Sequence, residues 1–180
     1  NLLENLLRWT RNQNGKTKIY ATLFNLTPVA RQVVSLFSAI ANAKEIELIN
    51  RIEGKFDIFA DEDMIKTVLR NLISNAIKFT YTGGQVELSL ADSGDYWTIY
   101  VKDNGKGIPK DLQAHLLKSD EYITTYGTHN EKGSGLGLIL CRDFIRMNKG
   151  KLHFYSQEGI GTTFYFTIPK ASSSAEAVSR

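Results

Sequence analysis

The chain has few of the residues that build disulfide-rich, zinc-binding or membrane-spanning proteins. Its 180 residues include a single cysteine, Cys141, which excludes a disulfide-stapled fold and favours a reducing, cytoplasmic setting. The histidines, His115, His129 and His153, have no Cys or His partner at metal-ligand spacing, so a zinc site is not expected. No apolar run approaches the ~20 residues that a bilayer-spanning helix needs. We therefore expect no membrane contact from this part of the protein.

Charge of one sign is also scarce. The 22 Lys and Arg and 19 Asp and Glu leave a net charge of +3, which is too small and too scattered to indicate a nucleic-acid partner. Hydrophobic residues make up 42% of the chain, as in ordinary globular domains with a full core. The first residue is Asn1 rather than Met and no signal-peptide pattern follows it, which predicts a piece of a longer protein.

Three parts follow one another along the chain. Residues 1–18 combine a leucine stripe at helical spacing with a polar linker, and predict the end of a helix that leans on something else. Residues 19–169 carry the alternating strand and helix patterns of one domain. Residues 170–180 are small and polar, and we expect them to be disordered.

Residues 63–80 predict the central helix of that domain. At about 100° of turn per residue, their apolar side chains form one broad arc. Asn71, Asn75 and Lys78 fall together at one border of the arc. Amide oxygens suit Mg²⁺, and a lysine supplies a point charge for phosphate. The alternative, left open by this segment alone, is a buried helix whose asparagines cap neighbouring loops.

The remaining elements predict an α/β two-layer sandwich. We expect a further helix from about 28 to 43, with Thr27 as N-cap and Pro28 in its first turn, a short one at 109–117 and another at 133–148. Strands are expected at 19–26, 47–52, 56–60, 85–90, 96–101, 151–156 and 163–168, with a turn at 53–54 and a hairpin around 92–95. The result is one mixed, mostly antiparallel sheet covered on one face by about three helices.

Three glycine clusters follow the central helix. Residues 102–109 (KDNGKGIP) place Asp103 at a strand end, where it could accept a hydrogen bond from an exocyclic amine, or only cap a tight turn. Residues 131–138 (EKGSGLGL) open a helix through glycines and predict an anion site, although Leu138 rules out the dinucleotide-binding fingerprint. Residues 159–164 (GIGTTF) favour a plain turn.

The ordered set of motifs resembles the catalytic and ATP-binding domain of bacterial sensor histidine kinases, in the GHKL superfamily with its Bergerat fold. The similarity covers about residues 20–169. Residues 71–80 (NLISNAIKFT) resemble its N box, 103–109 its first glycine box and 133–138 its second. Residues 116–119 (LLKS) match the family's aromatic box only poorly, which leaves the anchoring of the expected ATP lid, residues 118–132, in question.

The resemblance implies a role for each matching residue. Asn75 would ligate Mg²⁺, Asn71 and Lys78 would hold phosphate or metal-bound water, Phe79 would lie near the adenine, and Asp103 would accept the adenine amine. The implied ATP-binding set is Asn71, Asn75, Lys78, Phe79, Asp103, Gly105, Gly107, Ile108, Lys132, Gly133, Ser134, Gly135, Leu136, Gly137, Leu138 and Thr163, of which Asn71, Asn75 and Lys78 would be catalytic.

The resemblance also implies an activity. ATPases of this superfamily carry a glutamate where Asn71 stands, and an amide cannot act as a general base near neutral pH. A histidine kinase needs no such base, because an imidazole is itself a good nucleophile. The implied function is transfer of the γ-phosphoryl of Mg²⁺·ATP to a histidine on a dimerisation domain. None of the three histidines here has a phosphoacceptor context.

The implied partners are that histidine phosphotransfer domain, whose second helix would end in residues 1–18, and the receiver domain of a response regulator. The full-length protein would be a homodimeric, membrane-bound sensor, and this chain would belong to its cytoplasmic part. Two alternatives remain: a nucleotide-binding scaffold without productive transfer, and a GHKL ATPase.

Overall fold

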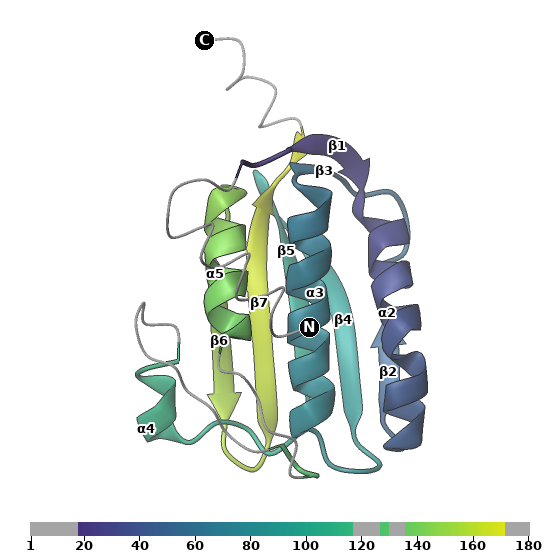
Figure 1. Ribbon diagram of the computed structural model, residues 1–180, viewed down its shortest axis with the longest axis vertical. Helices are drawn as coiled ribbons and strands as arrows, with labels where there is room; N and C mark the ends of the chain where they lie inside the picture. The colour runs from purple at the N-terminus through teal and green to yellow at the C-terminus, as the bar shows by residue number, and fades with distance from the viewer. Residues whose placement is uncertain (1–17, 117–126, 130–135, 172–180) are drawn as a thin grey trace.

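The computed structural model describes residues 18–116, 127–129 and 136–171, and it arranges them in two layers. Three long helices, α2 (Leu26–Ala43), α3 (Glu62–Phe79) and α5 (Gly137–Met147), lie over one face of a sheet, with α3 in the middle (Figure 1). A fourth, α4 (Lys110–Gln113), is a single turn and is shorter than the helix expected at 109–117. The predicted two-layer architecture is confirmed.

The sheet under these helices has five strands in the order β2-β4-β5-β7-β6. Strands β2 (Glu47–Asn50) and β4 (Gln85–Ser93) pair in parallel, and every other pair is antiparallel. The remaining three are β5 (Tyr96–Asp103), β6 (Leu152–Gln157) and β7 (Gly161–Pro169). The hairpin expected around 92–95 joins β4 to β5.

Two expected strands do not join this sheet. β1 (Thr22–Asn25) and β3 (Asp57–Ala60) form a separate antiparallel ribbon at one end of the helices (Figure 1). The turn expected at 53–54 therefore does not pair its two flanking strands, because β2 pairs with β4 and β3 pairs with β1. The expectation of a single sheet needs this correction.

The N-cap of α2 also differs from the expectation. Asn25, not Thr27, caps the helix, since its Oδ1 accepts hydrogen bonds from the backbone N–H groups of Thr27 and Phe56, both at 3.1 Å. The hydroxyl of Thr27 donates instead to the carbonyl of Gly54. Both residue types cap helices well. The segment that packs beside the helix start decides between them, because Asn25 accepts the N–H of Phe56 in that segment as well as the N–H of Thr27 in α2.

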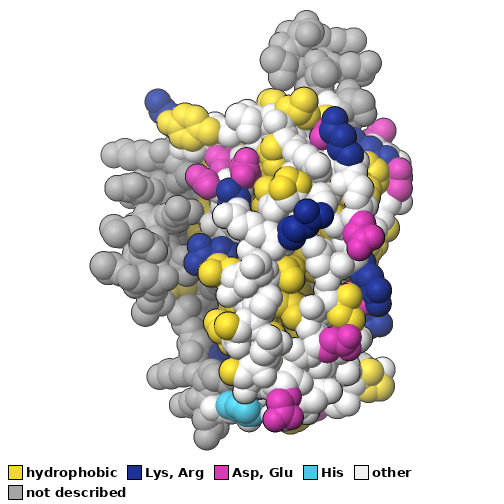
Figure 2. Space-filling view, turned by 90° about the vertical axis from the view of Figure 1, so that its right-hand side faces the viewer, with side chains coloured by type: hydrophobic (Ala, Val, Ile, Leu, Met, Phe, Trp, Pro, Cys, Tyr) yellow, Lys and Arg dark blue, Asp and Glu magenta, His cyan; other side chains and the backbone are white. Residues whose placement is uncertain are grey.

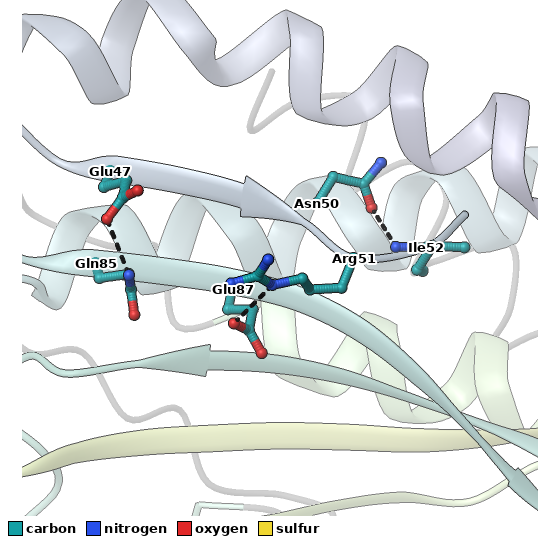
Figure 3. A network of polar contacts seen from close by, with 6 residues as sticks. All are labelled: Glu47, Asn50, Arg51, Ile52, Gln85 and Glu87. Carbon is teal, nitrogen blue, oxygen red and sulfur yellow. Dashed lines mark hydrogen bonds and ion pairs between the residues drawn. The ribbon is translucent and has the colours of Figure 1, made fainter.

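Polar pairs fix the parallel edge of the sheet (Figure 3). Gln85 Nε2 donates to Glu47 Oε2 at 2.9 Å, and Arg51 Nε lies 3.3 Å from Glu87 Oε2. Asn50 ends β2 by accepting the N–H of Ile52 through its own side chain. These exposed contacts join residues of the paired strands and add little stability.

The core lies between the helices and the sheet. Nearly all of the apolar arc predicted for residues 63–80 is buried. Asp61 caps α3 by accepting the N–H of Met64. Alternate residues of the strands face the same core, including Val101 in β5 and Phe166 in β7. The buried residues of α3 are Met64, Ile65, Val68, Leu69, Leu72, Ile73, Ala76 and Ile77.

The structure also bears on the cysteine, the surface charges and the possibility of a membrane-spanning helix. Cys141 is fully buried, and burial raises the pKa of its thiol. On the face shown in Figure 2, basic and acidic side chains are interspersed with hydrophobic ones rather than gathered by sign. Within the described ranges, no helix is long and apolar enough to cross a membrane. The leucine stripe and most of the expected lid and tail lie outside the described residues.

Candidate functional site

Asp103 ends β5 with its carboxylate buried beneath the helices. Its side chain is on the helix-facing side of the sheet, and the residue is 7% exposed. Oδ1 accepts two backbone N–H groups, from Gly105 at 2.9 Å and from Thr162 at 3.1 Å. Oδ2 makes no hydrogen bond within the described part of the chain. A buried polar atom without a partner is unfavourable, so Oδ2 offers an acceptor to a ligand that carries an N–H donor.

Burial raises the pKa of Asp103 from 3.8 to about 6. The two backbone hydrogen bonds lower it, but they are outweighed by the loss of solvent around the carboxylate. At neutral pH the group is ionised and held in an environment that disfavours its charge. A strongly perturbed carboxyl in a partly unsatisfied position is typical of a functional site.

The loop after Asp103 lies directly on the C-terminal end of α3. The N–H of Lys106 donates to the carbonyl of Phe79 at 3.0 Å. A Cβ on Gly105 would overlap that same carbonyl, so only glycine permits the approach. Gly107 has a φ of 67°, and a Cβ there would overlap the carbonyl of Gln157 in β6. The first glycine cluster therefore packs between α3 and the β6–β7 turn.

The third glycine cluster forms a wall of the same site. A Cβ on Gly161, whose φ is 140°, would overlap the backbone carbonyl of Asp103. The next residue, Thr162, donates its N–H to Asp103 Oδ1 and places its hydroxyl 2.8 Å from Ser156 Oγ. The turn at 159–164 is therefore more than the plain turn that was expected, because Gly161 and Thr162 pack against and hydrogen-bond to Asp103.

Thr162 is the residue that sequence reasoning missed, and Thr163 was named in its place. The register pairs Thr163 with Lys102, so strand alternation puts its side chain on the face of the sheet away from Asp103. The structure does not bring Thr163 to this group. Sequence pattern shows that β7 alternates, but it does not show which of its residues stands opposite Asp103.

The polar border of α3 reaches towards the start of α5. Asn71 is half-buried, and its Nδ2 donates to the carbonyl of Thr67 at 2.9 Å. A Cβ on Gly137 would lie 2.9 Å from Asn71 Oδ1, so the two elements meet at this amide. One turn further along α3, the amide of Asn75 is half-buried and makes no hydrogen bond with any residue that the structure describes. Asn75 therefore remains available to a ligand.

Positive charge collects beside Phe79. The Nζ of Lys78 lies 4.8 Å from the centroid of the half-buried ring, and the Nζ of Lys106 lies 5.1 Å from it. Lys106 was not singled out from the sequence, although it lies between Gly105 and Gly107 of the first glycine cluster. Two ammonium groups around one aromatic ring suit an anionic ligand with a flat, apolar part.

The second glycine cluster is described from Leu136 onwards; Lys132, Gly133, Ser134 and Gly135 lie outside the described residues. Leu136 is 7% exposed, and Leu138 and Ile108 pack against the core. At the start of α5, Leu136 makes no capping hydrogen bond through its side chain, and the first turn of the helix holds no acidic residue. Backbone N–H groups at such a helix start favour anions.

A metal here would need ligands other than a protein carboxylate cluster. In the described part of the chain, no three His, Cys, Asp or Glu side chains lie close enough together to hold an ion. The amides of Asn71 and Asn75 are hard oxygen ligands, which suit Mg²⁺ when phosphate oxygens and water complete its shell.

The chain is similar to proteins of a known family. Residues 60–172 match the family model described as histidine kinase-, DNA gyrase B- and HSP90-like ATPase. The adaptive-response sensory kinase SasA of Crocosphaera subtropica is 30% identical over 170 residues, which are 93% of this chain and 44% of that protein. The chain thus spans less than half the length of this relative.

Solved structures of histidine kinases are similar to this chain as well. The nucleotide-free catalytic domain of histidine kinase ThkA is similar with a TM-score of 0.71 and 31% identity, over 84% of this chain and 96% of that one. Full-length ShkA, solved in complex with AMPPNP, is similar with a TM-score of 0.79 and 27% identity, over 94% of this chain and 35% of that one.

Proposed function

Because the chain belongs to the histidine kinase-, DNA gyrase B- and HSP90-like ATPase family, we propose that it binds Mg²⁺·ATP and transfers the γ-phosphoryl group to a histidine on a separate helical domain. The observation that carries the proposal is the buried carboxylate of Asp103 with Oδ2 lacking a donor. The exocyclic amine of adenine is a donor of the right kind for this acceptor.

The adenine end of the proposed site consists of Asp103, Gly105, Gly107, Ile108 and Phe79. Thr162 belongs to it as a positioning residue, because its N–H orients the carboxylate. Gly105 and Gly107 allow the loop that follows Asp103 to approach α3 and β6 closely. ShkA, whose structure is similar, holds AMPPNP, and this likeness supports a nucleotide as the ligand.

The phosphate end consists of the polar border of α3 and the start of α5. Asn75 is the proposed Mg²⁺ ligand, and Asn71 and Lys78 would hold phosphate oxygens or metal-bound water. The second glycine cluster, with Lys132, Gly133, Ser134, Gly135, Gly137 and Leu138, would bind phosphate through backbone N–H groups. When bound, Mg²⁺ neutralises the charge that develops between the β- and γ-phosphates.

The chemistry asks little of the protein beyond positioning. An imidazole nitrogen attacks the γ-phosphorus, the bond from that phosphorus to the β–γ bridging oxygen breaks, and ADP leaves. Asn71 stands where a water-activating base would be needed for hydrolysis, and its amide cannot take a proton. Lys78 stabilises the charge on the phosphoryl oxygens. Slow hydrolysis and efficient transfer to a positioned histidine follow from the same residues.

The acceptor histidine and the next partner lie in other domains. We propose that residues 1–18 end the second helix of a dimerisation domain, that the full-length protein is a homodimer and that a response-regulator receiver domain takes the phosphoryl group. We further propose that the chain is the cytoplasmic part of a longer sensor kinase.

Phosphorylation of the acceptor domain tests the transfer. With Mg²⁺ and γ-labelled ATP, the chain should label the helical acceptor domain of its own full-length protein with an acid-labile, base-stable phosphate. Label should be absent when the acceptor histidine is changed to glutamine. Tight ATP binding with no phosphohistidine would overturn the kinase and leave a binding module, and rapid ATP turnover without an acceptor would indicate an ATPase.

Changing Asn75→Ala should weaken Mg²⁺·ATP binding by about 10- to 100-fold, because it removes an oxygen ligand from a charged group. Titration calorimetry with and without Mg²⁺ measures the effect, and the variant should lose the gain in affinity that Mg²⁺ gives the wild type. The neighbouring exposed residue gives a matched control, since Ser74→Ala on the same helix should change neither value. Unchanged Mg²⁺ dependence in Asn75→Ala would place the metal elsewhere.

A further inference from the structure

The last turn of α3 ends in a carbonyl that collects hydrogen bonds from two distant parts of the chain. The carbonyl of Lys78 accepts from Lys44 Nζ at 3.0 Å, from the N–H of Thr128 at 3.0 Å and from Thr128 Oγ1 at 3.2 Å. Lys44 follows α2, and Thr128 lies 50 residues beyond Lys78. A helix leaves its last carbonyls without intrahelical partners, so donors from elsewhere must satisfy them.

Lys44 brings a buried charge to this helix end. The residue is only 7% exposed, and its Nζ also donates to the carbonyl of Ile77 at 3.0 Å. Burying an ammonium is unfavourable unless it is hydrogen-bonded, and a cation at a helix C-terminus is favoured by the helix dipole. A methionine would fill similar space without a charge. The ammonium therefore serves the two carbonyls that it contacts.

Thr128 holds the same turn from the other side. Its single hydroxyl hydrogen is shared between the carbonyl of Thr80, 2.8 Å from Oγ1, and that of Lys78, and Thr80 is the C-cap residue of α3. Gly127, immediately before Thr128, is buried, whereas His129 after it is exposed and lies 3.3 Å from Thr82 Oγ1 through Nε2. Thr128 is thus the point at which this short stretch meets α3.

The held turn carries Lys78 and Phe79. Between the carbonyls of Lys78 and Thr80, that of Phe79 accepts the N–H of Lys106 from the loop after Asp103. Three consecutive carbonyls are therefore bound by residues from three other segments. Any rotation of this turn would move the Lys78 ammonium and the Phe79 ring, which lie together at 4.8 Å, away from the loop that holds Asp103.

We propose that Lys44 and Thr128 are positioning residues that together clamp the C-terminal turn of α3, and so set Lys78 and Phe79 for the nucleotide. Thr128 lies within the range expected for the ATP lid, but neither residue was singled out by a sequence motif, and neither needs to touch the ligand. The inference rests on the proposed ATP site, but the clamp itself is a property of the free protein. It predicts that the two residues are coupled, because they donate to one carbonyl.

Thr128→Val is the sharpest test, since valine has the same shape and lacks only the hydroxyl. Titration calorimetry should show Mg²⁺·ATP binding weakened about 5- to 30-fold, as expected for one or two neutral hydrogen bonds. Thr128→Ser should stay near wild type. Thr82→Val is the matched control, because it removes the contact of the same stretch with His129 and leaves the helix end intact.

A second measurement separates the clamp from the ATP site. In the nucleotide-free protein, the Thr80 amide, which bonds to the carbonyl of Ala76, should exchange its hydrogen at least about fivefold faster in Thr128→Val than in wild type or Thr82→Val. Wild-type protein that fails to bind ATP would overturn the proposed function. Wild-type binding that Thr128→Val leaves unchanged, or equal losses in Thr128→Val and Thr82→Val, would overturn the clamp.

The coupling is tested with Lys44→Met. If one turn is held by both residues, the loss of ATP affinity in the double variant Lys44→Met/Thr128→Val should be clearly smaller than the product of the two single losses. Independent, multiplicative losses would overturn a shared clamp. Should Lys44→Met fail to fold, Thr128→Val, Thr128→Ser and the exchange of the Thr80 amide still decide the proposal.

Discussion

Asp103→Asn should stabilise the free domain at pH 7 and at the same time weaken ATP binding by more than about 100-fold. Asparagine can keep the acceptor Oδ1 that Gly105 and Thr162 use, while removing a charge that burial disfavours. The other side-chain oxygen becomes an NH₂ group, which faces the adenine amine donor to donor. A lost charged hydrogen bond plus this repulsion accounts for the expected loss.

The stabilisation has a defined pH dependence. The folded pKa of Asp103 is raised, from 3.8 to about 6, so the folded state holds the proton more tightly than the unfolded state. The proton on Asp103 therefore adds its full contribution to the unfolding free energy below about pH 4, and this contribution is lost as the pH rises through about 6. The raised pKa of Asp103 corresponds to at most about 3 kcal/mol of stability. Asp103→Asn lacks the titrating group and should not lose stability over this window.

Chemical denaturation of both proteins from pH 4 to 7.5 measures the difference. The gap in unfolding free energy should widen from pH 4 to about 6 and then stay constant. Asp143→Asn is the control: that carboxylate is equally buried, at 7% exposure, but it is paired with Arg142 and Arg146. Its loss should destabilise the domain and leave ATP affinity unchanged. Parallel pH curves for wild type and Asp103→Asn would contradict the assigned environment of Asp103.

The sequence predicts what depends on periodicity. Helical spacing placed the central helix at 63–80, within one residue of Glu62–Phe79, because a buried helix repeats its apolar side chains in a regular way. The border residues Asn71, Asn75 and Lys78 follow from the same repeat. The hairpin between β4 and β5 is equally local, since its turn lies between two alternating strands.

What depends on long-range register stays hidden from the sequence. Thr162 rather than Thr163 meets Asp103 because β7 pairs with β5 in one register out of several, and the core residues of both strands select it. Strand β3 pairs with β1 instead of β2 for a similar reason. The resemblance to the family's motifs identifies the glycines but does not identify the residues that they contact. A glycine pattern shows that close approach is possible. It does not show that Gly105 meets Phe79 or that Gly161 meets Asp103.

Two glycines with the same backbone conformation separate strain from close approach. Gly107 and Gly159 have φ values of 67° and 77°, so an alanine is strained at either position. A Cβ on Gly159 would meet nothing within 4 Å, whereas a Cβ on Gly107 would overlap the carbonyl of Gln157. Gly159→Ala should therefore cost only the left-handed strain of about 1 to 2 kcal/mol and leave ATP binding unchanged.

Gly107→Ala should cost the same strain plus the displacement of two backbone segments, about 3 to 5 kcal/mol in all. No side-chain rotation can relieve an overlap between a Cβ and a carbonyl. The loop must move away from β6, and the hydrogen bonds of Lys106 O with Gly159 N and of Ile108 N with Ser156 Oγ must lengthen. Since that loop carries one wall of the proposed adenine pocket, ATP binding should fall by more than about tenfold even where the variant remains folded.

Denaturation and calorimetry on the two variants give the result directly. The difference between them isolates close approach, because strain is common to both. Equal stabilities would mean that Gly107 is required only for its φ. A destabilised Gly107→Ala that still binds ATP as tightly as Gly159→Ala would separate the loop from the pocket, and would leave Asp103 as the sole contact of this segment with the base.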